Sequence, residues 1–392
     1  MSVHVVSKAD NRQHATFDLP SSDPSPLKPS SVRVRSSLLS LSSNNLTYAL
    51  YGTFARWWDA YPVPPTAPAP YNGSSEWGTI LFGFWATGSH SVDLELTHSE
   101  LDGHWKEISE YRASLMPLYN RYRVFDTQGT ELAEFAWDVA VGTIFVAGYL
   151  LSEYIFTPDP AAHPPIHPCG IETETGVQDW TVADADLLKA VFVVLGASTK
   201  MARSTVYDLF KRPSGAGPLG EGKFAVGTLG YPDVGLAGKW IAGVAPRPER
   251  IVIADFGGRA GTLERVVDNI KTNESLQDVK AVIIAVGNEQ KTLWVYTADE
   301  IQAQHASFVS LAKVQMNTSG VYEAAIKLRG AADCFCEVDK AWKRWLEDRE
   351  AAAPDLHLVW GEGIAGERGI AAGWDKLCAG SVAPGDALVY RV

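Results

Sequence analysis

The hydrophobic pattern of the first third of the chain consists of short apolar runs separated by polar breaks. Residues 31–41 begin with strict alternation of apolar and polar positions, which predicts a half-exposed strand, and residues 77–86 form a second strand-like run. Five prolines fall within residues 61–71 and favour a surface loop there. Residues 1–30 are polar, which predicts a frayed arm or a short edge strand. A string of short β elements favours a small β-barrel.

The pattern changes in the middle of the chain. Residues 131–155 are apolar at helical spacing and predict a long buried helix. Residues 190–195 form an unbroken apolar run, the pattern of a strand that is buried on both faces. A turn of small residues, 196–199, follows, and a helix is expected from Lys200 onward. A strand, a tight turn and a helix in this order are typical of a dinucleotide-binding unit, in which the helix N-terminus points at a phosphate.

Strands and helices alternate after this unit. Residues 224–228, 250–256 and 280–287 predict three more strands, and residues 263–270 predict a helix. This alternation predicts an α/β fold with a doubly wound parallel sheet.

The tail combines a charged amphipathic helix with two strand-like runs, at residues 356–360 and 387–392. We expect these strands to return to the first domain and complete it. The expected domains are a first, β-rich domain over residues 1–135, completed by residues of about 340–392, and a nucleotide-binding domain over residues 136–339.

The turn after the first buried strand is the predicted cofactor site. The usual fingerprint is G-x-G-x-x-G, whereas this chain has Gly196 and Ser198 at the first two glycine positions and Ala202 at the helix-packing position. Small residues still allow close approach of a phosphate, and Lys200 would add a positive charge. The alternative is a turn that is merely small and holds no nucleotide. The predicted cofactor-binding residues are Gly196, Ala197, Ser198, Thr199, Lys200, Met201, Thr228 and Gly287.

Thr228 ends the second predicted strand, where a dinucleotide-binding domain meets the adenosine ribose. An acidic residue at this place favours NAD, and a neutral or basic one favours NADP. Because Thr228 is neutral, we expect NADPH.

Residues 111–126 are dense in hydrogen-bonding aromatic side chains. Tyr119, Asn120 and Tyr122 are the best candidates for substrate contacts outside the turn. The alternative is a structural tyrosine corner that holds the fold together.

The composition narrows the function classes. The formal net charge is −12 and no Lys/Arg-rich run exists, which argues against a nucleic-acid-binding protein. The 13 Trp, 14 Tyr and 14 Phe fit a ring-lined ligand pocket or a large apolar core. The polar N-terminus and the absence of an uninterrupted apolar run of 18 residues predict a cytoplasmic protein without a membrane segment.

The four cysteines are too few and too scattered for a disulfide scaffold, so we expect reduced thiols. His163, His167 and Cys169 form an H-x3-H-x-C pattern that could chelate a metal. The pattern lacks a fourth ligand nearby, and we predict no metal.

Three blocks of residues carry a resemblance to a known family. Residues 44–49, N-N-L-T-Y-A, resemble an N-N-x-T-Y-A segment; residues 111–113 with 118–122 resemble an R-A…Y-N-x-Y block; and residues 197–202 look like an A-S-S-K-T-A loop. In this order, the blocks resemble a quinone-oxidoreductase-like family of unknown function within the medium-chain dehydrogenase/reductase superfamily.

The resemblance implies a GroES-like β-barrel domain, a Rossmann-type nucleotide-binding domain, and a cleft between them for a nicotinamide and a small hydrophobic substrate. It also implies a role in secondary metabolism, with a polyketide-like substrate, a polyketide synthase as a partner, and a homodimer by analogy. The Gly-His-Glu segment and four-cysteine lobe of the zinc alcohol dehydrogenases are missing, so catalytic zinc is not expected. Residues 288–290, Asn-Glu-Gln, replace a Thr-His-Trp-Glu-like segment of the family and keep only its acid.

Three functions follow from these observations. The first is a zinc-independent, NADPH-dependent reductase of a conjugated enone, a quinone or a polyketide-like substrate. The second is a non-redox cyclase or isomerase of the pericyclase kind, acting on a polyketide or polyene in a degenerate reductase scaffold. The third is a binding or chaperone-like partner of a larger synthase. For an enzyme, the expected catalytic residues, which would donate hydrogen bonds to a developing oxyanion, are Asn45, Tyr48, Tyr119, Asn120 and Tyr122.

Overall fold

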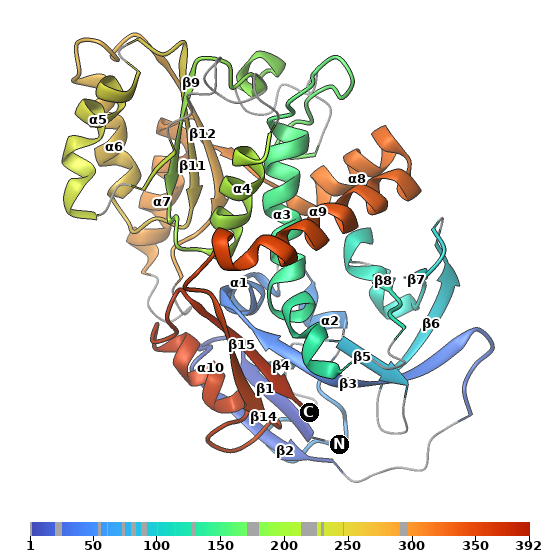
Figure 1. Ribbon diagram of the computed structural model, residues 1–392. Coiled ribbons are helices and arrows are strands. Elements are labelled where there is room, and N and C mark those ends of the chain that lie inside the picture. Colours follow the sequence, from blue (N-terminus) through green and yellow to red (C-terminus); the bar gives the residue numbers. More distant parts are fainter. Residues whose placement is uncertain are drawn as a thin grey trace. The chain divides into compact units, whose positions relative to one another are not determined.

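A computed structural model of the chain describes most of its 392 residues and divides them into two compact units (Figure 1). Unit 1 comprises Met1–Thr143, Gln290–Thr297 and Asp355–Val392, and unit 2 comprises Ile144–Glu289 and Ala298–Pro354. The described residues are 2–19, 26–53, 56–60, 62–72, 75–79, 84–87, 92–99, 101–113, 115–126, 131–170, 180–212, 226–228, 231–245, 247–290 and 297–392.

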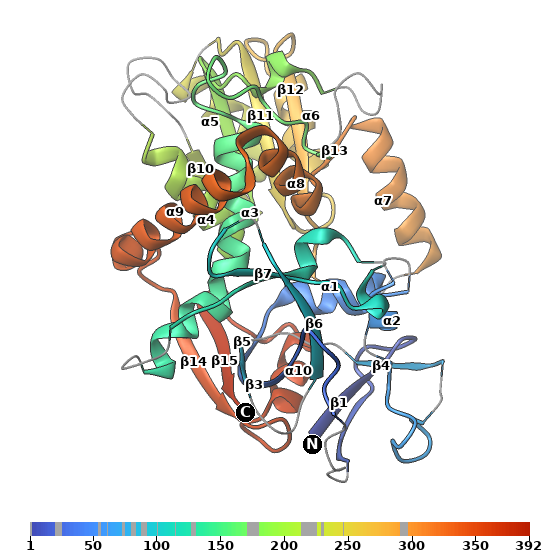
Figure 2. The ribbon, with the colours of Figure 1, turned by 90° about the vertical axis from the view of Figure 1, so that its right-hand side faces the viewer.

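Unit 1 is built on two sheets. The smaller sheet has the order β2-β1-β4, and the larger follows β14-β15-β3-β6-β7-β8, with β5 also paired to β3. The strands are β1 (Ser2–Ser7), β2 (His14–Asp18), β3 (Ser31–Leu41), β4 (Trp77–Thr79), β5 (Phe84–Thr87), β6 (Val92–His98), β7 (His104–Glu107), β8 (Arg121–Arg123), β14 (His357–Glu362) and β15 (Asp386–Arg391). The last strand, β15, pairs antiparallel with β3. The C-terminal end of the chain therefore lies within the same sheet as an early strand, as Figures 1 and 2 show.

Helices and short helical turns complete unit 1. They are α1 (Ser43–Tyr51), α2 (Trp57–Ala60), η1 (Glu110–Arg112), η2 (Pro117–Asn120), η3 (Leu132–Phe135), η4 (Asp138–Gly142) and α10 (Ile370–Cys378). Helices α1 and α10 share one apolar cluster with the strands, including Val6, Leu46, Trp58, Trp374 and Leu388. This cluster joins residues from both ends of the sequence.

The sequence predicts a frayed arm or a short edge strand over residues 1–30. For β1 this prediction is wrong, because β1 is the central strand of the smaller sheet. β2 and β4 pair with its two edges, and its side chains pack into apolar clusters on both faces: Val5 is 0% exposed and packs with Leu19, and Val6 is 1% exposed and packs with Leu46. Most of the Ser and Pro residues that suggested an arm fall in residues 20–30, after β2, and residues 20–25 lie outside the described residues.

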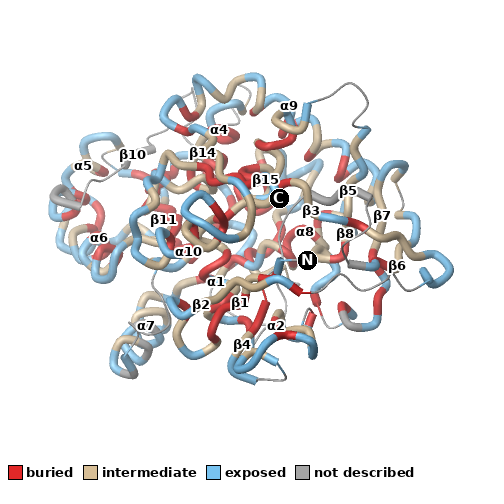
Figure 3. The backbone as a smooth tube through the Cα atoms, turned by 90° about the horizontal axis from the view of Figure 1, so that it is seen from below, coloured by how far each residue is buried: buried red, intermediate tan, exposed pale blue. Residues whose placement is uncertain are grey.

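Unit 2 contains a five-stranded, all-parallel sheet with the order β10-β9-β11-β12-β13. Its strands are β9 (Ala190–Leu195), β10 (Val226–Thr228), β11 (Arg250–Phe256), β12 (Lys280–Gly287) and β13 (Val314–Gln315). All six residues of β9 are buried, and so are most of those of β11, whose buried residues are red in Figure 3. A strand that is covered on both faces must be apolar throughout, which explains the unbroken runs in the sequence.

Helices cover both faces of this sheet (Figure 1). They are α3 (Thr143–Leu150), η5 (Leu151–Ile155), η7 (Val182–Ala185), α4 (Lys200–Phe210), η8 (Tyr231–Leu236), α5 (Ala237–Val244), α6 (Thr262–Lys271), α7 (Ala298–Ser310), α8 (Thr318–Arg329) and α9 (Ala331–Ala352). Helices α5 and α6 pack on one face through Ile241, Val266 and Ile270, among others. The predicted α/β fold with a doubly wound parallel sheet is confirmed.

The long apolar helix expected over residues 131–155 is present as a succession of helical turns. Over the described residues, the helical stretch Leu132–Ile155 is the one candidate long and apolar enough to cross a membrane, with 24 residues and a mean hydropathy of 1.5 in its most apolar window. Glu134, Asp138 and Glu153 interrupt its apolar sequence. In this structure 61% of the window is buried inside the protein, as in the core helix of a globular fold.

Candidate functional site

The order of the parallel sheet defines one place where a ligand site is expected. Strand β10 lies on one side of β9, and β11 lies on the other, so the chain changes direction between β9 and β11. In doubly wound sheets, ligands bind outside the carboxyl ends of the strands at such a switch point. The turn predicted to bind the cofactor, residues 196–199, lies at the carboxyl end of β9 and is therefore at this place.

Three glycines bring the backbone close together at the ends of β9, β11 and β12. Gly196 has φ +70°, and a Cβ there would lie 3.2 Å from the carbonyl carbon and oxygen of Phe256. Gly257 has φ +99°, and its Cβ would lie 2.6 Å from the oxygen of Asn288. At Gly287 a Cβ would meet the Phe256 oxygen at 3.1 Å. Side chains at these positions would strain or separate the loops, so glycine keeps the rim of the sheet compact.

The helix after the turn begins with a capped N-terminus. Thr199 is the N-cap of α4, and its hydroxyl accepts a hydrogen bond from the Ala202 amide at 3.2 Å. Lys200 opens the helix, and Met201 follows it on α4. Arg203 folds back to the turn, where its Nε donates to the Ser198 carbonyl at 3.0 Å. Two cationic side chains, those of Lys200 and Arg203, therefore lie at the start of the helix that follows the turn. Arg203 was not predicted from the sequence, because it lies outside the glycine fingerprint.

Acidic side chains stabilise the neighbouring loops. Asp255, near the end of β11, accepts hydrogen bonds from the amides of Gly257 at 3.1 Å and Gly258 at 2.7 Å. Burial raises the pKa of Asp255, and the two amide hydrogen bonds act against that rise. Glu289 accepts from the Ala260 amide at 3.1 Å. Asp255 was not predicted from the sequence, because it lies inside an apolar run. Its role becomes visible only through the loop amides from which it accepts hydrogen bonds.

Another residue predicted to bind the cofactor, Thr228, lies on the strand next to β9. Thr228 ends β10 and is in register with Val194 of β9. Its backbone therefore lies beside the carboxyl end of β9. Residues 224 and 225, the first two of the predicted strand, lie outside the described residues.

In unit 1, two of the predicted catalytic tyrosines form one aromatic cluster with a tryptophan. The ring of Tyr48 on α1 lies edge-on to Trp57 with centroids 4.2 Å apart, and edge-on to Tyr119 on η2 at 6.1 Å. Trp57 and Tyr119 are 6.0 Å apart. Burial, and then the neighbouring Tyr119 hydroxyl to which Tyr48 is hydrogen-bonded, raise the pKa of Tyr48 well above its usual value. The raised pKa makes the Tyr48 hydroxyl a weaker acid than an ordinary tyrosine, and it is a hydrogen-bond donor at physiological pH.

Asn120 and Tyr122 belong to an adjacent network around a buried ion pair. Arg112 Nε lies 3.1 Å from Glu107 Oε2 and donates to Asn120 Oδ1 at 2.9 Å. The Tyr122 hydroxyl donates to the same Glu107 oxygen at 2.5 Å, and Arg112 donates to the Tyr119 carbonyl. The Glu107 carboxylate is fully buried, so these donors offset the cost of its desolvation. The network holds the turn that carries Tyr119.

Asn45 is one helical turn before Tyr48. Its Oδ1 accepts a hydrogen bond from the Ser42 amide at 2.8 Å, at the start of α1. This contact fixes the beginning of the helix that presents Tyr48. The structure thus brings Tyr48 and Tyr119 together, while the polar groups of Asn45, Asn120 and Tyr122 bond to the surrounding fold.

The H-x3-H-x-C pattern does not converge on one point. His167 Nδ1 accepts from the Cys169 amide at 3.0 Å, and the Cys169 thiol donates to the Gln315 carbonyl at 3.2 Å. The ring of His167 lies edge-on to Trp180 at 5.3 Å. In the described part of the chain, no three or more His, Cys, Asp or Glu side chains gather as a metal-binding group.

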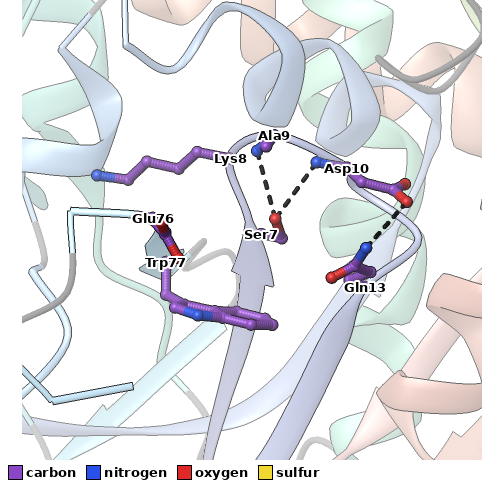
Figure 4. A pocket seen from close by; sticks show the side chains of 7 residues that line it. All are labelled: Ser7, Lys8, Ala9, Asp10, Gln13, Glu76 and Trp77. Carbon is purple, nitrogen blue, oxygen red and sulfur yellow. Dashed lines mark hydrogen bonds between the residues drawn. The ribbon is translucent and has the colours of Figure 1, made fainter. Parts of the chain in front are cut away.

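A surface pocket of about 410 Å³ lies at the turn between β1 and β2 (Figure 4). The Ser7 hydroxyl accepts hydrogen bonds from the amides of Ala9 and Asp10, both at 3.3 Å, and Gln13 donates to Asp10. The polar groups that line the pocket therefore form hydrogen bonds mainly with one another. The pocket is lined by none of the predicted site residues; its lining is Ser7, Lys8, Ala9, Asp10, Gln13, Glu76 and Trp77.

Comparison with known proteins gives similarities of two kinds. Among solved structures, the chain is similar to Escherichia coli quinone oxidoreductase complexed with NADPH (12% identity, TM-score 0.46, covering 100% of each chain). It is also similar to CurA of Vibrio vulnificus in complex with NADPH (11%, TM-score 0.44, 100% of this chain and 99% of that chain). A third is the CurF ER cyclopropanase from the curacin A biosynthetic pathway (10%, TM-score 0.42, 100% and 99%). No curated protein matches the sequence.

A protein family matches most of the sequence. Its description is "Protein of unknown function (DUF2855)", and the matched segments are residues 39–81 and 76–383. They include the turn after β9, the Tyr48 helix and the Arg112–Tyr122 block. The chain belongs to this family.

Proposed function

We propose that the chain is an NADPH-dependent reductase of a conjugated enone, a quinone or a polyketide-like substrate. The observation that carries the proposal is the glycine-lined rim at the switch point between β9 and β11, next to the N-terminus of α4. A dinucleotide needs a backbone that it can approach closely and a positive helix end for its phosphates, and this rim supplies both.

The residues present fit such a cofactor. Gly196 leaves room at the turn, and Lys200 and Arg203 add positive charge on the first turn of α4. We propose that the residues predicted from the sequence, Gly196 to Met201 with Thr228 and Gly287, hold the cofactor. When bound, NADPH would supply a hydride to the substrate.

The tyrosine cluster is the proposed source of the hydrogen bond and the proton. The Tyr48 hydroxyl is neutral at physiological pH, as any tyrosine is, and can donate a hydrogen bond to a substrate carbonyl oxygen as negative charge develops there. Tyr119 is hydrogen-bonded to it and would relay the proton. Arg112, Glu107, Asn120 and Tyr122 would position Tyr119 through the turn they hold.

The first experiment is a titration of NADPH into the full-length protein, followed by tryptophan fluorescence. We expect saturable binding, and a Lys200→Ala change should weaken it about tenfold, equivalent to ~1.4 kcal/mol. The control is Lys239→Ala, an exposed lysine on α5, which should leave the affinity unchanged. Absence of binding at millimolar NADPH would reject the reductase.

The second experiment tests the tyrosine in a screen of enones and quinones. Tyr48→Phe should lower kcat roughly 10²-fold while the Kd for NADPH stays the same. Tyr71→Phe is the matched control, because Tyr71 also packs in an aromatic group, against Phe17 and Trp77, at 5.3 and 4.8 Å. If the Tyr48→Phe protein is as active as the wild type, Tyr48 has no role in the reaction. The proposed cofactor site would not be affected by that result.

Two observations favour the non-redox cyclase or isomerase as a second candidate. The Thr199 hydroxyl already bonds the Ala202 amide, and the buried Asp255 carboxyl lies at the same rim, so two features compete with a phosphate. A protein that binds no NADPH but converts a polyene or polyketide would fit this arrangement.

A further inference from the structure

Two histidines face each other on the N-terminal hairpin, in a region that the proposed reductase does not use. His4 lies on β1 and His14 on β2, and the register pairs His4 with Thr16 and Val6 with His14. The two histidines are therefore diagonal neighbours on one face of the hairpin. Their ring centroids are 5.0 Å apart.

One nitrogen of each ring is held by an oxygen atom. His4 Nδ1 lies 3.0 Å from Thr16 Oγ1, and His14 Nε2 lies 2.9 Å from Asp375 Oδ1 of α10. Asp375 is a carboxylate and accepts a hydrogen bond from His14 Nε2–H, which leaves the lone pair of His14 on Nδ1. The Thr16 hydroxyl can donate or accept, and in the tautomer in which it accepts from His4 Nδ1–H the lone pair of His4 is on Nε2. The edge of Trp374, with its centroid 6.2 Å from that of His4, packs beside the pair.

The opposite nitrogens, His4 Nε2 and His14 Nδ1, are buried and have no hydrogen-bond partner among the described residues. A buried polar atom without a partner costs stability, and proteins rarely leave one so. Here two such atoms belong to adjacent rings. A single ion that accepts one lone pair from each ring would give both nitrogen atoms a partner.

We propose that His4 Nε2 and His14 Nδ1 bind one divalent first-row transition-metal ion, with water in its remaining positions. Imidazole nitrogen is a preferred ligand of Zn²⁺, Cu²⁺ and Ni²⁺. Because no third His, Cys, Asp or Glu joins the pair in the described chain, the ion has two protein ligands. It would fasten β1 to β2 and, through Asp375, to α10, and it is separate from the chemistry of the switch point.

The test uses Zn²⁺ and the full-length protein without an affinity tag, by isothermal titration calorimetry. We expect one bound Zn²⁺ to be lost in both His4→Gln and His14→Gln, and Thr16→Val to weaken the affinity at least tenfold. The matched control is His357→Gln: His357 Nε2 also lies beside a carboxylate, 3.2 Å from Asp386 Oδ1, but its side chain is 65% exposed. This change should keep the stoichiometry.

X-ray absorption of the wild-type protein with one equivalent of Zn²⁺ keeps the proposal testable if the variants do not fold. The proposal expects only nitrogen and oxygen ligands, with two imidazoles. Sulfur ligation, an unchanged stoichiometry in folded His4→Gln and His14→Gln proteins, or no Zn²⁺ binding at all would overturn it.

Discussion

At the scale of single residues, the carboxyl group of Asp208 on α4 lies in a strongly perturbing environment. Its side chain is fully buried, Oδ1 lies 3.4 Å from an Arg344 nitrogen, and Oδ2 has no hydrogen-bond partner in the described chain. Burial, followed by the nearby Glu153 carboxylate, raises the pKa of Asp208 to about 8. The folded protein therefore keeps this acid neutral at a pH where the unfolded chain ionises it.

The consequence is a stability that depends on pH. Between about pH 4 and pH 8 the folded state holds a proton that the unfolded state has lost, so the free energy of unfolding falls as the pH rises. The loss is at most ~1.4 kcal/mol for each pH unit. Asp208→Asn mimics the neutral acid, and we expect it to flatten this slope in urea unfolding curves measured from pH 4 to 8.

Asp348 provides a contrast for the same measurement. It accepts from the Tyr207 hydroxyl at 2.8 Å and lies 2.7 Å from the Lys211 ammonium, and these partners lower its pKa. Its contribution is present at neutral pH and is lost as the pH falls through the lowered pKa. Asp348→Asn should therefore leave the slope between pH 4 and 8 intact. An identical effect of both substitutions would contradict the assignment to Asp208.

The sequence alone identified some site residues and missed others for a physical reason. Gly196 and Thr199 could be found because a turn between a strand and a helix restricts residue type locally. Tyr48 and Tyr119 were both chosen, but their contact joins α1 to η2 across many residues, and no local pattern encodes it. Asp255 went unnoticed because its role depends on two amides in the following loop.

At the scale of elements, the parallel sheet was the most predictable part. The strands Ala190–Leu195, Arg250–Phe256 and Lys280–Gly287 have the predicted bounds, because burial on both faces requires unbroken apolar runs. The hairpin of β1 and β2 was missed. Val5 and Val6 are both buried although they are adjacent on β1, and the residues of β2 are only partly buried, so neither strand alternates cleanly between apolar and polar positions.

The close approach of loops at the rim of the sheet can be tested with one methyl group. Gly257→Ala places a Cβ 2.6 Å from the Asn288 oxygen at φ +99°. We expect a loss of roughly 2–4 kcal/mol in the free energy of unfolding, together with weaker NADPH binding.

Gly243→Ala is the matched control for that substitution. Gly243 lies in α5, and an added Cβ would meet nothing within 4 Å. This change should stabilise the protein by about 0.5–1 kcal/mol, because alanine favours the helix. Similar urea midpoints for the two variants would show that the rim tolerates side chains.

At the scale of the whole molecule, the chain leaves unit 1 after Thr143, contributes Gln290–Thr297 to it, and returns to it at Asp355 for its last elements. β15 pairs on one side with β14 and on the other with β3, and Leu388, Trp374 and Tyr390 belong to the same apolar cluster as Leu46. The end of the sequence is thus part of the interior of the unit in which the sequence starts.

A chain that ends at Pro354 should separate the behaviour of the two units. We expect amide hydrogens of β3 to lose their protection in hydrogen exchange, because β15 no longer covers that edge. Amides of β9 and β11 should stay protected, since unit 2 is complete without residues 355–392. Persistent protection of β3 would show that the first unit folds without its final strands.

The pairing of β3 with β15 also has a consequence for the rate of folding. The paired residues Leu38–Leu41 and Leu388–Arg391 are separated in the sequence by the segments of unit 2, so a large loop must close before the two strands can pair. Pairings of such high contact order form slowly, and we expect this one to be a late step in the folding of unit 1. Until it forms, this part of β3 has an unpaired edge, which is a template for pairing with another chain.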